Sequence, residues 1–267
     1  MNKYIESINF LISKKTQNIP HGQDNLFQHS VNVYNKLRLW KCNEDICFAG
    51  LFNSIYNIEK DKDVIRNIIG TKSENLIKSN DKIISLADKL VKTYIEIIDG
   101  YFDNQDILQN YIYFRDHVPW KFIGSGYNKF KWRNFKYELN FKNKIEKYLK
   151  KHTQKILKNL HMFDFLKLER VYASANSYGT VHQSHRDYAL DSKGGITVMY
   201  YLNNNWNLNY AGETVFYNNE EIVKSIIPKP GRVIIFDGSI EHCARDMRRD
   251  VNDLRMVLTF KYNININ

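Results

Sequence analysis

Cysteine is scarce in this chain of 267 residues, which contains only Cys42, Cys47 and Cys243. Three cysteines without a regular spacing do not form a disulfide framework, so we expect reduced thiols and a cytoplasmic location. Long apolar runs are also missing, because no stretch approaches the roughly 20 apolar residues of a membrane-spanning helix. The first fifteen residues lack the apolar core and the cleavage site of a secretory signal. The sequence therefore predicts a protein that has no membrane partner.

The charge of the chain is unbalanced, with 39 basic and 29 acidic residues and a formal net charge of +10. This excess favours anionic partners, including nucleic acid. No polybasic block stands out, however, and a lysine-rich surface on a soluble protein explains the same count. Hydrophobic residues make up 43% and charged residues 25% of the chain, as is typical of a folded globular protein. The length allows one large domain or two modest ones.

The first 105 residues or so have the pattern of an all-α domain. Apolar side chains recur at intervals of three and four from Ile83 to Ile98, which is the period of a helix with one buried face. We expect two further helices at Leu26 to Trp40 and Asn43 to Tyr56. A basic helix is expected later, at about Glu138 to Leu160, as a support for the second half of the chain.

From Leu166 onwards, short β-branched and aromatic runs alternate with turn residues. The expected strands are Leu166 to Ala173, Gly195 to Leu202, Glu213 to Tyr217, Ile222 to Ile227, Arg232 to Asp237 and Arg255 to Tyr262. Many short strands at close spacing are typical of a sandwich or a double-sheet jelly roll. We therefore expect an α+β protein with a helical domain at 1–105 and a β domain at 106–267, whose core spans 166–262.

The most informative segment is His185-Arg186-Asp187, which is followed by His242 fifty-five positions after the aspartate. Residues two apart in an extended strand project from one face, so His185 and Asp187 can reach the same metal ion. Two imidazoles and one carboxylate leave three coordination positions open, which is the ligand set of non-haem Fe(II) oxygenases. Zinc is the main alternative, but the sequence lacks the His-Glu-x-x-His helix that is typical of hydrolytic zinc sites.

Two further residues favour a site that binds an anion. Arg255 comes thirteen residues after His242 and opens the apolar run that ends at Phe260. A guanidinium inside a barrel is costly unless it meets an anion, and it matches a carboxylate with two parallel hydrogen bonds. Tyr201 lies in an apolar segment, where its hydroxyl can donate to the same carboxylate. An arginine that faces solvent at a strand end is the alternative explanation.

The order and spacing of these motifs resemble the 2-oxoglutarate and Fe(II)-dependent dioxygenase superfamily, and most closely its prolyl 4-hydroxylase-like branch. The matching segments are Asn176 to Gly179, His185 to Tyr188, Tyr200 to Asn203, Gly212 to Thr214, Pro230 to Arg232, His242 and Arg255. Together they span a little over a third of the chain. One departure is Ala211, where the branch has the first glycine of Gly-Gly-Glu-Thr.

The resemblance implies a double-stranded β-helix (jelly-roll, cupin-like) core, with iron held by the two histidines and the aspartate already named. It places Arg255 and Tyr201 on the distal carboxylate of 2-oxoglutarate, with Thr259 nearby. It places Tyr178 and Asn176 near the end of the co-substrate that chelates iron. The implied cofactors are Fe(II), 2-oxoglutarate and O2, and ascorbate is a candidate reductant.

The implied reaction is hydroxylation of a C–H bond with release of succinate and CO2. A protein or peptide side chain is the expected substrate, and a prolyl residue is favoured by the branch alone. A second hypothesis is hydroxylation or demethylation of a nucleic-acid base, which the net charge and the aromatic segment Tyr127 to Tyr137 would suit. A third is a non-catalytic jelly-roll binding protein, since a fold alone does not prove activity.

The amino-terminal segment Pro20 to Tyr56 resembles the opening of an HD-type helical domain. His29 matches the first histidine of that pattern, but Asn53 and Ser54 stand where a His-Asp pair is expected. Neutral Asn and Ser are poor replacements for imidazole and carboxylate around a divalent cation. The resemblance therefore implies a degenerate HD-like domain without phosphohydrolase chemistry, which serves for substrate or partner docking or as a plain scaffold.

Overall fold

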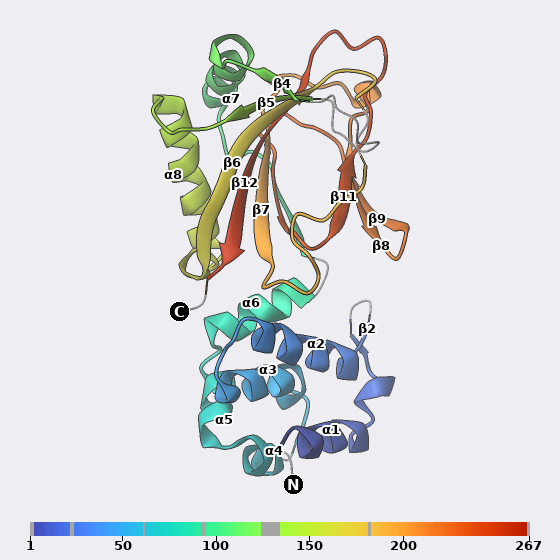
Figure 1. Cartoon of the computed structure of the whole chain (residues 1–267). Helices are drawn as coiled ribbons and strands as arrows, with labels where there is room; N and C mark the ends of the chain where they lie inside the picture. Colours follow the sequence, from blue (N-terminus) through green and yellow to red (C-terminus); the bar gives the residue numbers. More distant parts are fainter. Residues whose placement is uncertain are drawn as a thin grey trace. The chain divides into compact units, whose positions relative to one another are not determined.

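The computed structural model of the protein describes residues 3–21, 24–60, 62–91, 94–123, 134–180 and 183–265 (Figure 1). The chain divides into two compact units. The first comprises Met1–Tyr94 with the short segments Asp191–Lys193 and Ile264–Asn267, and the second comprises Ile95–Leu190 with Gly194–Asn263. The division lies before Ile95, earlier than the expected 105, because Ile95–Ile98 forms a strand of the second unit.

The first unit is helical. Its helices are α1 (Lys3–Ser13), α2 (Leu26–Leu39), α3 (Glu44–Tyr56), α4 (Lys62–Ile69), α5 (Thr71–Lys78) and α6 (Lys82–Val91), with a short 3-10 turn at Thr16–Asn18 and two-residue strands β1 (Pro20–His21) and β2 (Asp24–Asn25). Asparagine side chains fix where the two central helices begin. Asn25 accepts a hydrogen bond from Gln28 N at the start of α2, and Asn43 accepts one from Ile46 N at the start of α3.

Two helices end or begin elsewhere than the sequence predicts. The helix expected over Ile83 to Ile98 ends at Val91, and β3 (Ile95–Ile98) pairs with β10 of the large sheet. The four residues Ile95–Ile98 fit the period of a helix as well as that of a strand. Their pairing with β10 makes them a strand. The basic helix begins only at Lys144, where the Asn143 side chain caps it, because the residues around Glu138 form strand β5.

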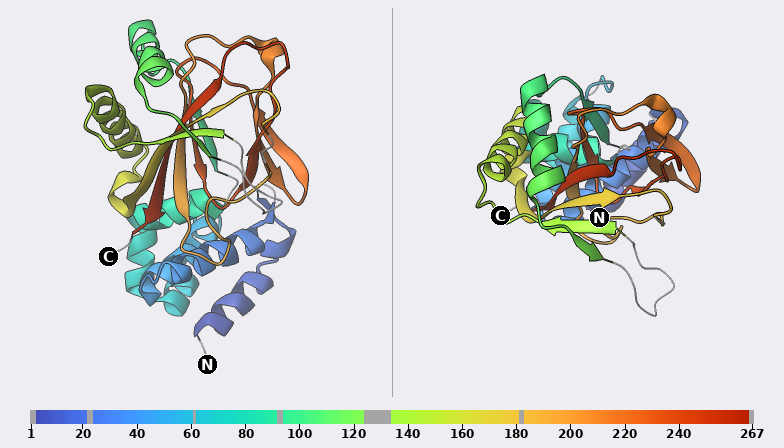
Figure 2. Two further views of the ribbon diagram at one scale, coloured as in Figure 1. Left: turned by 45° about the horizontal axis from the view of Figure 1, so that its top comes forward. Right: turned by 90° about the horizontal axis from the view of Figure 1, so that it is seen from above.

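The second unit consists of two antiparallel sheets with helical support. Its strands are β3, β4 (Lys121–Ile123), β5 (Asn134–Glu138), β6 (Leu166–Asn176), β7 (Gly195–Tyr201), β8 (Thr214–Asn218), β9 (Glu221–Ile226), β10 (Val233–Asp237), β11 (Glu241–Ala244) and β12 (Arg255–Ile264). The large sheet has the order β3-β10-β7-β12-β6-β5-β4, and the small sheet has the order β11-β8-β9. Figure 2 shows the two sheets from further directions. This arrangement confirms the predicted jelly roll.

Helices cover one face of the large sheet. They are α7 (Asn104–Ile112), which continues into a π-helical turn at Tyr113–His117, and α8 (Lys144–Asn159), with 3-10 turns at Phe163–Phe165 and Leu208–Tyr210. Thr153 of α8 shares a hydrogen bond of 2.7 Å with the buried Tyr200 hydroxyl of β7. The opposite face of the large sheet is therefore left for the small sheet (Figure 1). A cavity lies between the two sheets.

Strands β7 and β10 are buried at every position, because helices cover one face and the small sheet covers the other. A cluster of buried side chains joins the two sheets: Met199, Tyr201, Phe216, Ile226, Ile234, Phe236 and Val257. This core fixes the strands whose side chains border the cavity. Among the described residues, no helix has the length and apolarity needed to cross a membrane.

Candidate metal and co-substrate site

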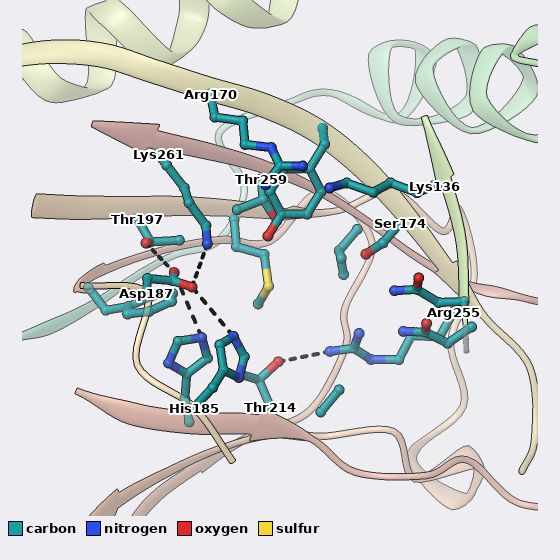
Figure 3. A pocket seen from close by; sticks show the side chains of 18 residues that line it. Lys136, Arg170, Ser174, His185, Asp187, Thr197, Thr214, Arg255, Thr259 and Lys261 are labelled. Atoms are coloured by element: carbon teal, nitrogen blue, oxygen red, sulfur yellow. Dashed lines mark hydrogen bonds and ion pairs between the residues drawn. The ribbon is translucent and has the colours of Figure 1, made fainter. Parts of the chain in front are cut away.

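A cavity of about 370 Å³ lies between the two sheets (Figure 3). Its lining residues alternate along their strands, so each strand contributes one face. On β12 these residues are Arg255, Val257, Thr259 and Lys261. On β6 they are Arg170, Tyr172, Ser174 and Asn176. The remaining lining residues are Asn134, Lys136, His185, Asp187, Thr197, Met199, Thr214, Phe236, His242 and Ala244.

The two histidines predicted as metal ligands face each other as a backbone pair. His185 N donates to His242 O at 3.0 Å, and His242 N donates to His185 O at 2.9 Å. Their rings are 4.4 Å apart between centroids. Asp187 Oδ1 lies 3.4 Å from His185 Nε2, and Asp187 Oδ2 lies 3.8 Å from His242 Nε2. The structure therefore brings the three side chains together from positions up to 57 residues apart (242 − 185).

The backbone and neighbouring side chains hold Asp187 firmly in place. Its amide donates to Gly238 O at 2.7 Å. Its Oδ2 accepts from Thr197 Oγ1 at 2.6 Å, and its Oδ1 accepts from Lys261 Nζ at 2.6 Å. A side chain at position 238 is excluded, since an added Cβ would lie 2.5 Å from a ring carbon of Tyr188. The missing side chain at Gly238 thus leaves room for the Tyr188 ring next to Asp187.

The electrostatics of the site suit a cation. Burial by itself would raise the pKa of the Asp187 carboxyl, but the hydrogen bond to His185 and the charges of His242 and Lys261 hold it far below its usual range. Burial lowers the pKa of His242 to about 4, against the opposing effect of Asp187. The Nδ1 atom of His242 lies 2.9 Å from Ile240 O, so a neutral ring that donates there leaves Nε2 with a free lone pair.

The donor set fits a divalent transition metal. One ligand atom from each of His185, Asp187 and His242 lies within 4.8 Å of the others, and no other such group was found in the described part of the chain. Two imidazoles and a carboxylate on one side of a cavity leave the other side open. This is the arrangement that Fe(II) oxygenases require for a bidentate co-substrate and dioxygen.

Arg255 is buried, with 2% of its surface exposed, and it points into the same cavity. Its Nε donates to Gly212 O at 2.6 Å and its Nη2 donates to Thr214 Oγ1 at 2.8 Å. Within the described ranges, no carboxylate forms a salt bridge with this guanidinium. A buried cation without a counter-charge is costly. The side chain therefore fits a carboxylate group that enters the cavity from outside.

Of the other four residues predicted to bind the co-substrate, two line the cavity and two do not. Thr259 and Asn176 line the cavity, and Asn176 Oδ1 is buried without a hydrogen-bond partner among the described residues. Tyr201 and Tyr178 are not lining residues. The Tyr201 hydroxyl bonds to Thr214 Oγ1 at 2.7 Å and donates to Ile226 O at 3.1 Å, and Tyr178 is 52% exposed.

Tyr201 nevertheless contacts the predicted anion site through its neighbours. The Arg255 guanidinium carbon lies 5.3 Å from the centre of the Tyr201 ring, and both side chains bond to Thr214. In this arrangement Tyr201 supports the arginine instead of reaching into the cavity itself.

Several lining residues were missed by the sequence reasoning. Lys261 could have been found, because it lies six positions after Arg255 on the same strand and so faces the same way. Lys136, Arg170 and Tyr172 gave no such signal. They come from β5 and β6, and nothing local in the sequence shows that these strands border the metal ligands.

In the helical unit, His29 forms a different kind of pair. It is buried, and its Nε2 lies 2.8 Å from Asp88 Oδ1, which the sequence reasoning did not single out. Asn53 and Ser54, which stand in the place of the expected His-Asp, are half-buried on α3. The described residues of this unit contain no group of three converging metal donors.

Comparison with known proteins adds two matches to parts of the chain. Residues 173–263 match the family model described as the 2OG-Fe(II) oxygenase superfamily. Residues 10–80 match DUF6817, a domain of unknown function. A search of curated proteins gives no match.

Solved structures share the fold of the second unit. One is a prolyl hydroxylase from Trichoplax adhaerens in complex with a peptide fragment of the hypoxia inducible factor oxygen degradation domain (TM-score 0.52, 17% identity, 78% of this chain and 96% of that one). Another is a prolyl-4-hydroxylase from Pseudomonas putida (TM-score 0.51, 13% identity, 67% of this chain and 97% of that one). At these identities the likeness shows a common fold.

Proposed function

We propose that the chain is a 2-oxoglutarate-dependent iron dioxygenase, in line with the match of residues 173–263 to the 2OG-Fe(II) oxygenase superfamily, and that it hydroxylates a C–H bond of a protein or peptide side chain. The observation that carries the proposal is the convergence of His185, Asp187 and His242 on one side of a cavity. The buried Arg255 borders the same cavity.

In the proposed site, the two Nε2 atoms and the Asp187 carboxylate hold the iron. Lys261 and Thr197 fix the carboxylate by their hydrogen bonds, and Ile240 O fixes the ring of His242. These supporting contacts orient the ligands before any metal binds. Iron together with 2-oxoglutarate supplies the oxidising chemistry, and the chain supplies the binding groups and a cavity that restricts water.

The proposed position of the co-substrate follows from the one guanidinium in the cavity that is buried and has no acidic partner among the described residues. Arg255 would bind the distal carboxylate of 2-oxoglutarate, with Thr259 beside it. Tyr201 would hold the guanidinium in place through Thr214. Asn176 has an unsatisfied buried oxygen and would lie toward the metal-chelating end. Tyr178 is exposed, and a role for it at that end requires movement of its segment.

A solved structure of similar fold supports a peptide as the substrate. The Trichoplax adhaerens prolyl hydroxylase, 96% of which aligns with 78% of this chain, was solved with a peptide fragment. Nucleic acid is less well supported. The aromatic segment that suggested base stacking is described only at Phe135 and Tyr137. The Phe135 ring packs against Phe122, and the Tyr137 hydroxyl donates to Glu146 Oε1, while Tyr127, Phe130 and Trp132 lie outside the described residues.

The proposal is tested by oxygen consumption and succinate formation with iron and 2-oxoglutarate across panels of peptides, amino acids and oligonucleotides. We expect peptides to raise succinate formation above the substrate-free rate, with a mass increase of one oxygen atom in the peptide. A panel in which only oligonucleotides stimulate turnover would contradict the peptide assignment. The absence of succinate under every condition would contradict the catalytic assignment.

A further inference from the structure

The cavity carries more positive charge than the proposed cofactors use. Among its described lining residues are four cationic side chains, Lys136, Arg170, Arg255 and Lys261, and one carboxylate, Asp187. Figure 3 shows Lys136, Arg170 and Lys261 on the upper side of the view, away from the Arg255 group that bonds to Thr214. Arg255 is assigned to the co-substrate and Lys261 bonds to Asp187, so Lys136 and Arg170 need a separate explanation.

Three of the cations surround one aromatic ring. Lys136 Nζ lies 4.2 Å from the centre of the Tyr172 ring, the Arg170 guanidinium carbon lies 5.1 Å from it, and Lys261 Nζ lies 5.7 Å from it. The quadrupole of a ring attracts cations at such distances, so Tyr172 holds like charges together that would otherwise repel one another. The result is a fixed cationic wall, which we define as Lys136, Arg170 and Lys261 around Tyr172.

One carboxylate outside the cavity lining partly compensates this wall. Glu138 Oε1 lies 3.0 Å from Lys136 Nζ and 2.6 Å from Arg170 Nη2. The Glu138 side chain is 53% exposed, so these are solvent-exposed ion pairs of small net strength. Burial, with the charges of Arg170 and Lys261, lowers the pKa of Lys136 in spite of the bond to Glu138. The ion pairs with Glu138 therefore leave the wall short of negative charge.

The charge balance with cofactors bound leads to the same conclusion. Fe(II) is a dication and 2-oxoglutarate is a dianion, so the pair leaves the net charge of the cavity unchanged. The four lining cations then stand against the carboxylates of Asp187 and Glu138, which leaves two positive charges among these six side chains. A neutral prolyl side chain would not balance them, whereas a substrate that carries its own carboxylate would.

The position of the wall indicates which part of the substrate is anionic. Lys261 Nζ bonds to Asp187 Oδ1 at 2.6 Å, so the wall begins directly beside the proposed metal position. An anion held by Lys136 and Arg170 would thus lie within a few bonds of the reacting carbon. Three cationic groups already lie within 5.7 Å of the centre of the Tyr172 ring, so a nucleobase would have to compete with them for this ring. This favours a carboxylate-bearing peptide over a nucleic acid.

We propose that the substrate is an acidic peptide, whose Asp or Glu carboxylate at or next to the oxidised residue binds to Lys136 and Arg170 over Tyr172. This inference rests on the proposed function, because it places the substrate in the same cavity as the iron. It goes further in naming the charge of the substrate and the two residues that select it.

The test measures binding and not turnover. The full chain is loaded with Mn(II), which prefers similar ligands, and with 2-oxoglutarate. Two short proline-containing peptides are compared by fluorescence anisotropy, identical except for Glu in one and Gln in the other beside the proline, with an uncharged dye on each. We expect the Glu peptide to bind about tenfold more tightly, with an advantage that shrinks at high salt. Equal affinity, or no measurable binding of the Glu peptide, overturns the proposal.

Variants of the wall locate the effect. Lys136→Ala and Arg170→Ala should each remove most of the preference for Glu, while Lys147→Ala on α8, an exposed lysine outside the cavity, should leave it unchanged. Glu138→Gln should tighten the Glu peptide, because it removes the competing carboxylate. Arg170→Glu should reverse the preference toward a Lys-containing peptide. A preference that survives both alanine substitutions overturns the assignment to these residues.

Two further measurements separate a loss of binding from a loss of fold, and a peptide ligand from a nucleic acid. The Arg170 side chain is 49% exposed, so its variants should keep the fold, and circular dichroism checks this. A thymidine oligonucleotide that binds through the same two cations more tightly than the Glu peptide would overturn the peptide assignment. Because Mn(II) binding requires no oxidation, the result stands even if the chain hydroxylates none of the peptides tested, and the two proposals fail separately.

Discussion

Each unit of the chain brings a histidine and an aspartate together, with different consequences. In the helical unit, His29 Nε2 and Asp88 Oδ1 lie 2.8 Å apart, and among the described residues no third metal donor converges on them. In the jelly roll, Asp187 lies 3.4 Å from His185 Nε2 and 3.8 Å from His242 Nε2, and all three side chains border a cavity. The difference teaches that a third donor and an open side, and not a His-Asp pair, distinguish a metal site.

The largest effect is expected from removing the shared carboxylate. Asp187→Ala should reduce succinate formation by at least about a hundredfold, because two imidazoles alone do not hold Fe(II) in a fixed geometry. Asp88→Ala is the matched control in the helical unit and should change the rate less than about twofold, since Asp88 is not among the described residues that line the cavity. Comparable succinate output from Asp187→Ala and the unaltered chain would refute the metal assignment.

The next effect concerns the co-substrate. Arg255→Ala should raise the apparent KM for 2-oxoglutarate by about a hundredfold or more, since breaking a buried charged pair costs about 3–5 kcal/mol. Arg255→Lys keeps the charge but loses the planar fork, so it should recover only part of the affinity. Steady-state rates at varied 2-oxoglutarate measure both. An unchanged KM in the alanine variant would remove Arg255 from the site.

A smaller effect is expected from Lys261, which bonds to the proposed metal ligand Asp187 and does not itself bind the metal. Lys261→Met keeps the length of the side chain and removes the hydrogen bond to Asp187 Oδ1. Iron affinity should fall about 10–100-fold, as is usual when a partner of a metal ligand is lost. Anaerobic Fe(II) titration gives the value, with Lys147→Met as a control. If both variants bind iron equally well, Lys261 does not position the carboxylate.

The smallest effect on catalysis is expected in the helical unit, where a buried carboxylate is fully satisfied. Glu74 accepts from Arg66 Nε at 2.6 Å and from the Tyr56 hydroxyl at 2.6 Å. The hydrogen bond from Arg66 is the main cause that lowers the pKa of Glu74 from 4.5 to about 2, against the effect of burial. Its stabilising contribution is therefore complete above pH 4.5 and is lost as the pH falls toward 2.

Glu74→Gln should destabilise the helical unit by about 1–2 kcal/mol at neutral pH and should change succinate formation little. The variant should also lose part of the pH dependence between 4.5 and 2. Hydrogen exchange of the α5 amides, measured at several pH values, tests this. Identical exchange in both proteins at neutral pH would show that the network contributes nothing to stability.

The sequence predicted those site residues that lie on one face of a single strand, because the alternation of side chains along a strand is a local pattern. His185 and Asp187 were found because residues two apart share a face, and Arg255 and Thr259 lie on one face of β12 for the same reason. His242 was found from the order of the motifs. The structure shows the physical link, since its backbone pairs directly with that of His185.

The remainder of the site depends on pairing between distant strands. The register of β5 and β6 sets Lys136 opposite Ser174 and brings Tyr172 beside it, and the basic composition before α8 had suggested a helix at Glu138. Tyr201 stays a prediction for the co-substrate site. Because β7 is buried on both faces, its pattern could not show that the Tyr201 hydroxyl bonds to Thr214. Ile95–Ile98 is too short for its period to separate strand from helix.

The most direct test of the account is the location of iron in the protein itself. Crystals of the full chain, grown without oxygen in the presence of Fe(II), should give one anomalous peak at the iron absorption edge. We expect this peak roughly 2.1 Å from His185 Nε2, His242 Nε2 and an Asp187 carboxylate oxygen. A peak at His29 and Asp88 instead, or an iron that contacts fewer than all three predicted ligands, would contradict the account.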